Sequence, residues 1–240
     1  MNIFVAGATG VIGRPLVALL VRAGHSVTGT TRSADRAGGI AAAGAEPVVV
    51  DVFDAAELMN AVVTARPQVI IHQLTDLPDQ LDPKAMETAL DRNARLRIDG
   101  TRNLMAAAAA AGVTRVVAQS IAFAYAEGPK PLRETDPLDV KAAGARLRTV
   151  GGVVGLESAV LGTPAVAGIV LRYGRLYGSG TWFSAPEGAG ALHVDAAAHA
   201  ALLAVTSGSA GIYNIAEDDG AVSIEKAKAE LGFDPNFRLT

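Results

Sequence analysis

The sequence predicts an α/β fold in which helices cover both faces of a doubly wound parallel sheet. Short runs of β-branched and other apolar residues alternate along the chain with stretches of helical periodicity, which is typical of such folds. The first of these units, residues 1–23, reads as a strand, a glycine turn and a helix. The chain has 240 residues, of which 50% are hydrophobic, so it can bury the core that one such domain requires.

The turn between the first strand and the first helix has the sequence Gly-Ala-Thr-Gly-Val-Ile-Gly, residues 7–13. The first glycine lets the chain leave the strand, the second lets backbone N–H groups approach a diphosphate, and the third lets the helix lie close to the strand. The helix N-terminus adds unpaired donors and a partial positive charge. We therefore predict dinucleotide binding here; the alternative is a turn with a structural role alone. The predicted cofactor-binding residues of this turn are Gly7, Thr9, Gly10, Val11, Ile12 and Gly13.

The residues after the second strand, predicted over residues 26–31, bear on the choice of cofactor. NAD sites place an acidic residue roughly twenty positions after the glycines, whereas an arginine there accommodates the 2′-phosphate of NADP. This chain has Arg32 and Arg36 near that point and no acid at the strand end. We predict NADP as the cofactor and leave NAD open. The alternative is that both arginines are solvated charges at the start of the next helix, residues 34–43.

Several motifs resemble those of extended and atypical short-chain dehydrogenase/reductases, the epimerase/dehydratase superfamily. Besides the glycine turn they are Gly-Thr-Arg-Asn-Leu-Met at residues 100–105, Arg-Tyr-Gly-Arg-Leu-Tyr-Gly-Ser-Gly at 172–180 and Leu-Gly-Phe-Asp-Pro at 231–235. The resemblance implies a Rossmann fold with one NAD(P)-binding domain over residues 1–240. Within that domain, residues 173–240 would contribute a small C-terminal substrate lobe. The resemblance also implies a homodimer that forms through the long helix at residues 84–111 and the helix after the fifth strand.

The third strand is predicted over residues 46–51 as a buried run that ends in an acid. The family resemblance implies that Asp51 and the backbone of Val52 contact the adenine amine of the cofactor. An alternative of equal weight is that Asp51 or Asp54 is the N-cap of the helix that begins near residue 55. Both roles can hold at once, so the two interpretations stay open.

The fourth strand, residues 68–72, ends where the family carries a segment that lines the nicotinamide ribose. The resemblance therefore assigns Leu74 and Thr75 to the cofactor site. His72, at the strand end, suggests an acid/base role, but a hydrogen-bonded structural role is the favoured interpretation. The loop at residues 76–83 lies on the carboxyl side of the sheet, where ligands of such folds bind.

The usual catalytic positions of the resembled family are altered in this chain. That family uses Tyr-x-x-x-Lys on the helix after the fifth strand, because the lysine lowers the pKa of the tyrosine and holds the nicotinamide ribose. Residues 141–161 contain no tyrosine, and alignment places Thr149 and Val153 at the two positions. Arg97 stands where the family has an asparagine, and Ile121 stands at its Ser/Thr position. The sequence is therefore that of an atypical member.

Other side chains must supply a proton if this protein is an enzyme. The candidates, in order of preference, are Tyr125, Ser120, Tyr173 and Tyr177, with Arg172 as an electrostatic stabiliser. The first functional hypothesis is an NADP-dependent oxidoreductase or epimerase-like enzyme that acts on a small carbonyl or sugar-like substrate. The alternative hypothesis is a non-catalytic NADP(H) sensor or regulator, because all four usual catalytic positions are changed.

The remaining elements follow the same alternation. A sixth strand is predicted over residues 166–172 and a last short strand over residues 211–214. Asp195 is predicted to cap a helix over residues 196–205, with His193 in a structural role. The helix after the fifth strand is rich in glycine, which indicates either close helix packing or ordering on ligand binding. Gly232 is predicted to end the terminal helix.

Composition excludes several classes of function. The net charge of −3 offers no electrostatic basis for a nucleic-acid or anionic-membrane partner, which leaves a small-molecule substrate. The chain has no cysteine, and among its histidines only His193 has an acid at ligand spacing, Asp195, which is a weak signal, so we expect no disulfide and no metal site. No apolar run is long enough to span a bilayer, and Met1 leads directly into a strand, so we expect a cytoplasmic protein.

Overall fold

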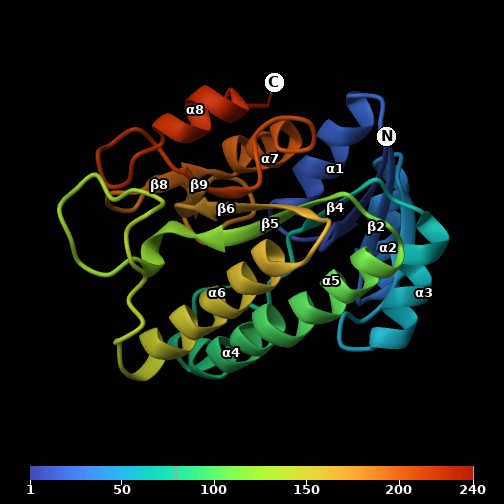
Figure 1. The fold of residues 1–240 in the computed structure, drawn as a ribbon, viewed down its shortest axis with the longest axis horizontal. Coiled ribbons are helices and arrows are strands. Elements are labelled where there is room, and N and C mark those ends of the chain that lie inside the picture. The colour runs from blue at the N-terminus through green and yellow to red at the C-terminus, as the bar shows by residue number, and fades with distance from the viewer. Residues whose placement is uncertain (79, 240) are drawn as a thin grey trace.

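The computed structural model describes residues 1–78 and 80–239. Within them the main sheet has seven parallel strands in the order β3-β2-β1-β4-β5-β6-β9 (Figure 1). The predicted doubly wound α/β fold is therefore confirmed. The strand order reverses between β1 and β4, the point beside which such sheets bind their ligands. The strands are β1 (Asn2–Ala6), β2 (Ser26–Thr31), β3 (Glu46–Val49), β4 (Val69–His72), β5 (Arg115–Ile121), β6 (Ala167–Tyr173) and β9 (Gly211–Ile215).

The central strands are buried on both faces. Ile3 and Val5 of β1 belong to the apolar core on one side of the sheet, and Phe4 belongs to the core on the other. In β4, Ile71 and Ile70 divide between the two cores in the same way. A strand that is covered on both faces is a nearly continuous apolar run, so these strands could be recognised in the sequence.

Helices cover both faces of the sheet (Figure 1). On one face α1 packs on α7, and their residues Leu16 and Ala197 share a core. On the other face Leu58 of α3, Leu104 of α5 and Leu156 of α6 share the second core, while α4 packs on α6. The helices are α1 (Gly13–Arg22), α2 (Ala37–Ala42), α3 (Ala55–Ala65), α4 (Pro83–Arg95), α5 (Thr101–Ala110), α6 (Gly144–Gly162), α7 (Val194–Leu203) and α8 (Glu225–Leu231).

The long helix predicted over residues 84–111 consists of α4 and α5 joined by a π-helical turn, Leu96–Gly100. Glycines of α6 let that helix lie close to this turn and to the end of α4. A Cβ at Gly155 would lie 2.7 Å from Ile98 Cγ1, and one at Gly152 would lie 3.0 Å from Ala94 Cα. Close packing is thus the reason for these two glycines. The homodimer implied through these helices remains a prediction.

The structure decides three other local predictions. The helix predicted over residues 34–43 begins as a 3-10 turn and becomes α2 only at Ala37. Asp54 is the N-cap of α3, since its carboxylate accepts the N–H of Glu57 at 2.9 Å, whereas Asp51 accepts the N–H of Phe53. Gly232 ends α8 as predicted, in the left-handed conformation that glycine tolerates.

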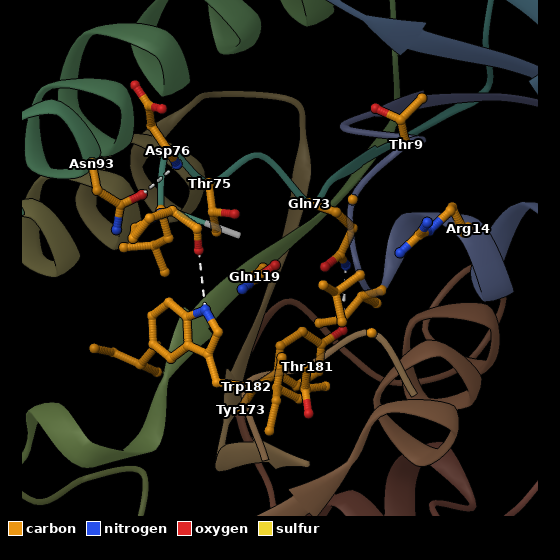
Figure 2. A pocket seen from close by; sticks show the side chains of 18 of the residues that line it. Thr9, Arg14, Gln73, Thr75, Asp76, Asn93, Gln119, Tyr173, Thr181 and Trp182 are labelled. Atoms are coloured by element: carbon orange, nitrogen blue, oxygen red, sulfur yellow. Dashed lines mark hydrogen bonds between the residues drawn. The ribbon is translucent and has the colours of Figure 1, made fainter. Parts of the chain in front are cut away.

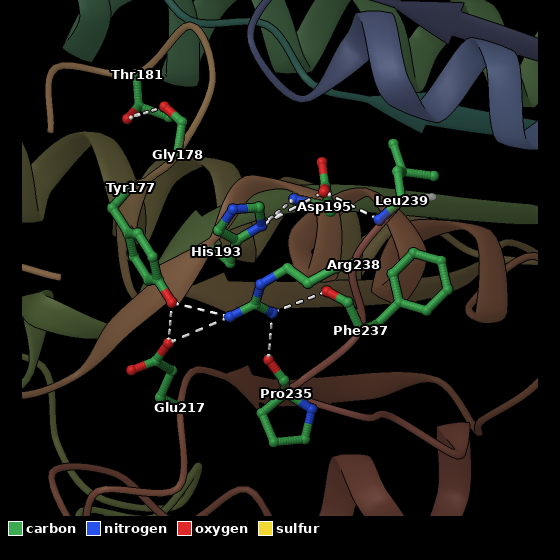
Figure 3. A network of polar contacts seen from close by, with 10 residues as sticks. All are labelled: Tyr177, Gly178, Thr181, His193, Asp195, Glu217, Pro235, Phe237, Arg238 and Leu239. Atoms are coloured by element: carbon green, nitrogen blue, oxygen red, sulfur yellow. Dashed lines mark hydrogen bonds and ion pairs between the residues drawn. The ribbon is translucent and has the colours of Figure 1, made fainter. Parts of the chain in front are cut away.

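The prediction that Asp195 caps the helix after the sixth strand is wrong. The helix α7 begins at Val194, and the Nδ1 atom of His193 accepts the N–H of Asp195 at 3.2 Å. The carboxylate of Asp195 instead accepts the N–H of Leu239 at 3.0 Å, so it anchors the chain near its C-terminus (Figure 3). The N-cap therefore lies two residues earlier than predicted, at His193, because a histidine ring nitrogen can accept a hydrogen bond as a carboxylate does.

The C-terminal part of the chain divides between two sheets. Strands β7 (Arg175–Tyr177) and β8 (Ala191–His193) pair with each other apart from the main sheet, whereas β9 joins the main sheet beside β6. Arg238 donates to the Tyr177 hydroxyl at 2.9 Å, and that hydroxyl donates to Glu217 (Figure 3). These contacts tie the end of the chain to β7. The division that assigns residues 173–240 to a substrate lobe remains a prediction. In the described part of the chain, no helix has the length and apolar character needed to cross a bilayer.

Candidate dinucleotide and substrate site

The glycine turn after β1 is packed tightly against its surroundings. Gly7 has φ +90°, and a Cβ there would lie 2.8 Å from the carbonyl oxygen of Gln73 at the end of β4. The N–H of Gly10 donates to the Gly7 carbonyl at 3.1 Å and closes the turn. A Cβ at Gly13 would lie only 2.1 Å from that same carbonyl. The turn therefore lies directly over the start of α1, where backbone amides are available to an anion.

A cavity of about 1390 Å³ opens beside this turn, at the carboxyl ends of the central strands. Figure 2 shows Thr9 and Arg14 at one side of it, with Gln119 and Trp182 across from them. The indole N–H of Trp182 donates to the Pro78 carbonyl at 3.0 Å, which fixes the ring against the loop after β4. The cavity is thus large enough for a dinucleotide and a small second molecule.

A smaller cavity of about 340 Å³ adjoins the first near the ends of β2 and β3. Its walls include the apolar side chains of Val52, Phe53 and Leu58. Arg32 and Arg36 line both cavities, so the two spaces meet at the arginines. A cavity that combines these apolar side chains with two arginines suits an adenosine that carries a phosphate.

The predicted cofactor-binding residues fall into two groups. The larger group lines one or both cavities: Gly7, Thr9, Gly10, Val11, Ile12, Arg32, Arg36, Val52, Leu74 and Thr75. Among the described residues, Gly13 and Asp51 do not line either cavity. Gly13 lies beneath the turn, and the Asp51 carboxylate accepts the N–H of Phe53 at 2.9 Å, as expected of the structural alternative.

Arg32 projects toward the loop after β4. Its guanidinium lies 3.4 Å from the Asp76 carboxylate, which lies equally close to Arg92. Asp76 is held in turn by its backbone N–H, which donates to the Asn93 side chain at 2.9 Å (Figure 2). The Arg32 side chain is 52% exposed, so this ion pair is worth little. A phosphate can therefore replace Asp76 as the partner of Arg32 at small cost.

The predicted catalytic residues Ser120, Tyr125 and Arg172 are not on the cavity walls that the described residues form. The Ser120 hydroxyl donates to Glu157 at 2.7 Å, and Arg172 donates to both oxygens of the same carboxylate at 2.9 and 2.7 Å. The buried Tyr125 hydroxyl donates to Asn214 at 2.7 Å. This placement does not support the predicted roles in proton donation and electrostatic stabilisation.

Strand alternation explains this correction. Successive side chains of a strand point to opposite faces, so Gln119 and Ile121 of β5 line the cavity while Ser120 faces α6. In β6 the same rule turns Tyr173 toward the cavity and Arg172 toward Glu157 on α6. The motif alignment points to the ends of these two strands, and the side chains that it selects lie on the face away from the cavity.

The other two candidate tyrosines are also engaged. Tyr173 lines the cavity, but its hydroxyl donates to the Ala197 carbonyl at 3.2 Å and accepts from Gln73 at 3.3 Å. Burial raises the pKa of Tyr173 well above its usual range, so the phenol stays protonated. Tyr177 lies outside both cavities among the described residues, with Glu217 and Arg238 as partners.

Several cavity residues were not predicted. Arg14 directly follows the last glycine of the turn, and Gln73 directly follows β4, so both positions carried a signal in the sequence. Gln119 was missed because the family motif begins at the next residue, Ser120. Gln73 is 4% exposed, and its Oε1 atom has no hydrogen-bond partner among the described residues. A buried acceptor without a partner at a cavity wall indicates a ligand that donates to it.

His72 has the structural role that was favoured for it. It is 1% exposed, its Nδ1 accepts the N–H of Leu74 at 3.2 Å, and its Nε2 lies 2.9 Å from the Thr101 hydroxyl. Because Nδ1 is the acceptor, Nε2 carries the proton and donates to Thr101. Burial, with a smaller contribution from the charge of Arg97, lowers the pKa of His72 from 6.5 to about 4.

This shift predicts acid sensitivity of the fold. The unfolded chain takes up the His72 proton near pH 6.5, whereas the folded chain takes it up only near pH 4. Stability from this residue is therefore complete above pH 6.5 and is lost as the pH falls to 4, by about 3 kcal/mol. Urea melts of His72→Asn, compared with the starting protein across this range, should show a shallower loss. Parallel curves for the two proteins would contradict the assignment.

Comparisons with known proteins agree with this geometry. A family model described as NAD(P)H-binding matches residues 7–148. A 3-diazoavenalumate denitrifying reductase of Streptomyces sp is 42% identical over 242 residues, which cover 92% of this chain and 77% of that protein. Among solved structures, UDP-glucose 4-epimerase of Thermotoga maritima has a TM-score of 0.79 at 18% identity, covering 99% of this chain and 94% of that chain. The dTDP-glucose 4,6-dehydratase of Streptomyces venezuelae, solved with NAD bound, has a TM-score of 0.78 at 18% identity, covering 99% and 93%.

The fold and the cavity beside its glycine turn define a dinucleotide-binding protein of the Rossmann class. The chain belongs to the NAD(P)H-binding family. The predicted resemblance to extended short-chain dehydrogenase/reductases is confirmed at the level of the fold, because the epimerase and the dehydratase both align over nearly the whole chain.

Proposed function

We propose that this protein is an NADPH-dependent reductase of a small, electron-poor organic substrate. The observation that carries the proposal is the continuity of the large cavity. It runs without a break from the glycine turn and Arg32 to the part lined by Gln119 and Trp182, which we call the second compartment, and its volume of about 1390 Å³ leaves room for another molecule. A protein that only sensed the dinucleotide would have no need of that compartment.

The chain offers a partner for each part of the cofactor. The backbone amides of the glycine turn suit the diphosphate, the apolar side chains of the smaller cavity suit adenine, and Arg32 with Arg36 suits a 2′-phosphate. The unpaired Oε1 of Gln73 suits a donor on the nicotinamide half. Bound NADPH supplies a hydride, that is, two electrons and one proton. The chain's residues then orient the substrate and exclude water.

The walls of the cavity favour a reaction that needs no proton from the protein. No lysine lines it among the described residues, and the Tyr173 hydroxyl is already bonded on both sides. Thr149 occupies the family's tyrosine position, but its hydroxyl donates to the Ala145 carbonyl at 3.2 Å. Val153, at the lysine position, is buried in the core. A carbonyl substrate would therefore find neither the lysine nor the free tyrosine hydroxyl that the resembled family uses to supply its proton.

A diazo substrate removes the requirement for a proton donor. The name of the Streptomyces relative describes a reductase that acts on a diazo compound and removes nitrogen. When a hydride replaces N₂ on an aryl diazonium ion, one C–H bond forms and the C–N bond breaks. The electron pair of the C–N bond leaves with N₂, and no further proton is consumed. We propose this reaction class for the present chain, with reduction of a carbonyl as the alternative substrate chemistry.

Isotope transfer tests the proposal. The protein is mixed with NADPH deuterated at its transferring carbon and an aryl diazonium salt, and the arene product is analysed by mass spectrometry against a protein-free blank. We expect one deuterium in the arene and a rate well above the blank. Tyr125→Phe should retain the rate, because that hydroxyl is buried away from the cavity. NADPH binding without transfer to the diazonium salt or to an aromatic aldehyde would contradict a reductase and favour the sensor.

A further inference from the structure

We propose that Arg97 binds an anionic group of the substrate, a carboxylate, at the wall of the large cavity. Identifying the bound molecule as a substrate rests on the proposed function, whereas the buried charge itself does not. Arg97 is the residue that replaces the family's asparagine, and nothing in the reaction described above makes use of it.

The local structure places the Arg97 side chain between the core and the cavity. The residue belongs to the π-helical turn Leu96–Gly100, a distortion that recurs at functional sites. It is 5% exposed, yet it lines the cavity. Its aliphatic part packs beside Gly152 of α6, where a Cβ would lie at an ordinary contact distance of 3.4 Å from Arg97 Cδ.

Charge is not balanced around this residue. Among residues 1–78 and 80–239, the buried side chains that are charged at neutral pH are Arg97, Glu157 and Arg172. The Glu157 carboxylate already accepts two hydrogen bonds from Arg172 and one from Ser120. Within the same described ranges, Arg97 has no hydrogen bond or ion pair. One buried positive charge is therefore uncompensated, although the field of Glu157 reaches it.

The uncompensated charge persists at neutral pH. Burial lowers the pKa of Arg97 to about 10, which still leaves the guanidinium protonated. Removing a cation from water without a partner costs several kcal/mol, and proteins retain such costs chiefly at functional positions. The hydroxyl and amide groups of a nicotinamide riboside are neutral and cannot balance the charge. A carboxylate can, and its two oxygens match the planar fork of arginine.

The rest of the compartment indicates the shape of the molecule that carries the anion. Trp182 lines the cavity together with Phe123 and Phe183. The hydrogen bond from its indole N–H to the Pro78 carbonyl fixes the ring. Flat apolar side chains of this kind suit an aromatic ring or a conjugated chain. We therefore infer an aromatic or conjugated carboxylate as the substrate class.

Calorimetric titration with a matched pair of probes tests the inference. Cinnamate carries a carboxylate on a flat conjugated frame, and cinnamamide has nearly the same shape without the charge. Both are titrated into the cofactor-free protein and into the protein saturated with NADP⁺. We expect cinnamate to bind about tenfold more tightly than cinnamamide in at least one of the two forms.

Two variants locate the effect. Arg97→Met should remove the preference for cinnamate and leave the NADPH affinity unchanged. It should also raise the melting temperature of the ligand-free protein, because a buried unpaired charge is lost. Arg102→Met is the control, since Arg102 is an exposed arginine of α5 that pairs with Asp99 at 3.0 Å. It should keep the preference for cinnamate.

The outcomes separate this inference from the proposed function. Equal binding of the two probes in both forms would overturn the anion site, as would a preference that survives in Arg97→Met. A loss of NADPH affinity in that variant, with the preference intact, would assign Arg97 to the cofactor. Failure of the starting protein to bind NADPH would contradict the reductase alone, because the cofactor-free titration still decides the anion site.

Discussion

Replacing Gly13 with alanine is expected to weaken NADPH binding by at least about a hundredfold. The added Cβ would lie 2.1 Å from the Gly7 carbonyl and 2.8 Å from the Ala8 carbonyl carbon, both of which belong to the backbone. No rotamer change can relieve a clash with backbone, so the turn must lift from the helix. The amides at the helix N-terminus then no longer converge on one diphosphate. Fluorescence titration of NADPH measures the loss.

Gly38→Ala is the matched control for this change. Gly38 lies in α2, and a Cβ there meets nothing within 4 Å. Alanine at an exposed helical site should stabilise the fold by about 0.5–1 kcal/mol and leave NADPH binding intact. Because Gly13→Ala also alters packing, thermal melts of both variants accompany the titrations. A folded Gly13→Ala protein with unchanged affinity would contradict the diphosphate site.

Reversing the charge of Arg32 is expected to reverse the preference between the two cofactors. Arg32 lines both cavities. Its ion pair with Asp76, at 3.4 Å, is weak, so a bound phosphate can replace the Asp76 carboxylate as its partner. In Arg32→Asp the carboxylate repels a 2′-phosphate but can accept hydrogen bonds from ribose hydroxyls. We expect NADPH affinity to fall about a hundredfold and NADH affinity to rise. Parallel titrations with both cofactors measure the ratio.

Arg22→Asp tests whether the change in net charge alone has this effect. Arg22 is exposed at the far end of α1, away from the glycine turn. It should leave the ratio of the two affinities unchanged. Equal affinity of the starting protein for NADPH and NADH would remove the phosphate argument, and it would leave the fold and the diphosphate site untouched.

Strand ends and turns could be predicted well because their causes are local. The glycine turn, the apolar run of β4 and the N-cap at Asp54 each depend on a few adjacent residues. The break of the long helix at the π-helical turn could not be predicted in this way. It coincides with close packing of Gly155 on Ile98, two residues that are far apart in the sequence.

The residues predicted to be catalytic show the limit of motif alignment. Ser120 and Arg172 stand at the expected strand ends, but the faces on which they lie place them beside Glu157 and not beside the cavity. Their neighbours Gln119 and Tyr173 line it instead. A shift of one residue along a strand reverses the face, so an alignment that is right about the strand can still be wrong about the side chain.

The sequence by itself determined the fold class, the glycine turn and the arginines that bear on cofactor choice. Each of these is encoded by the periodicity or spacing of neighbouring residues. Only the tertiary structure decided that Arg97 is a buried cation without a partner and that Gln73 has an unpaired oxygen. Burial and partnership depend on segments that are distant in the chain. They are α6, which packs on the π-helical turn, and the end of β6, where the Tyr173 hydroxyl accepts from Gln73. These contacts place a buried cation and an unpaired hydrogen-bond acceptor on the wall of the cavity.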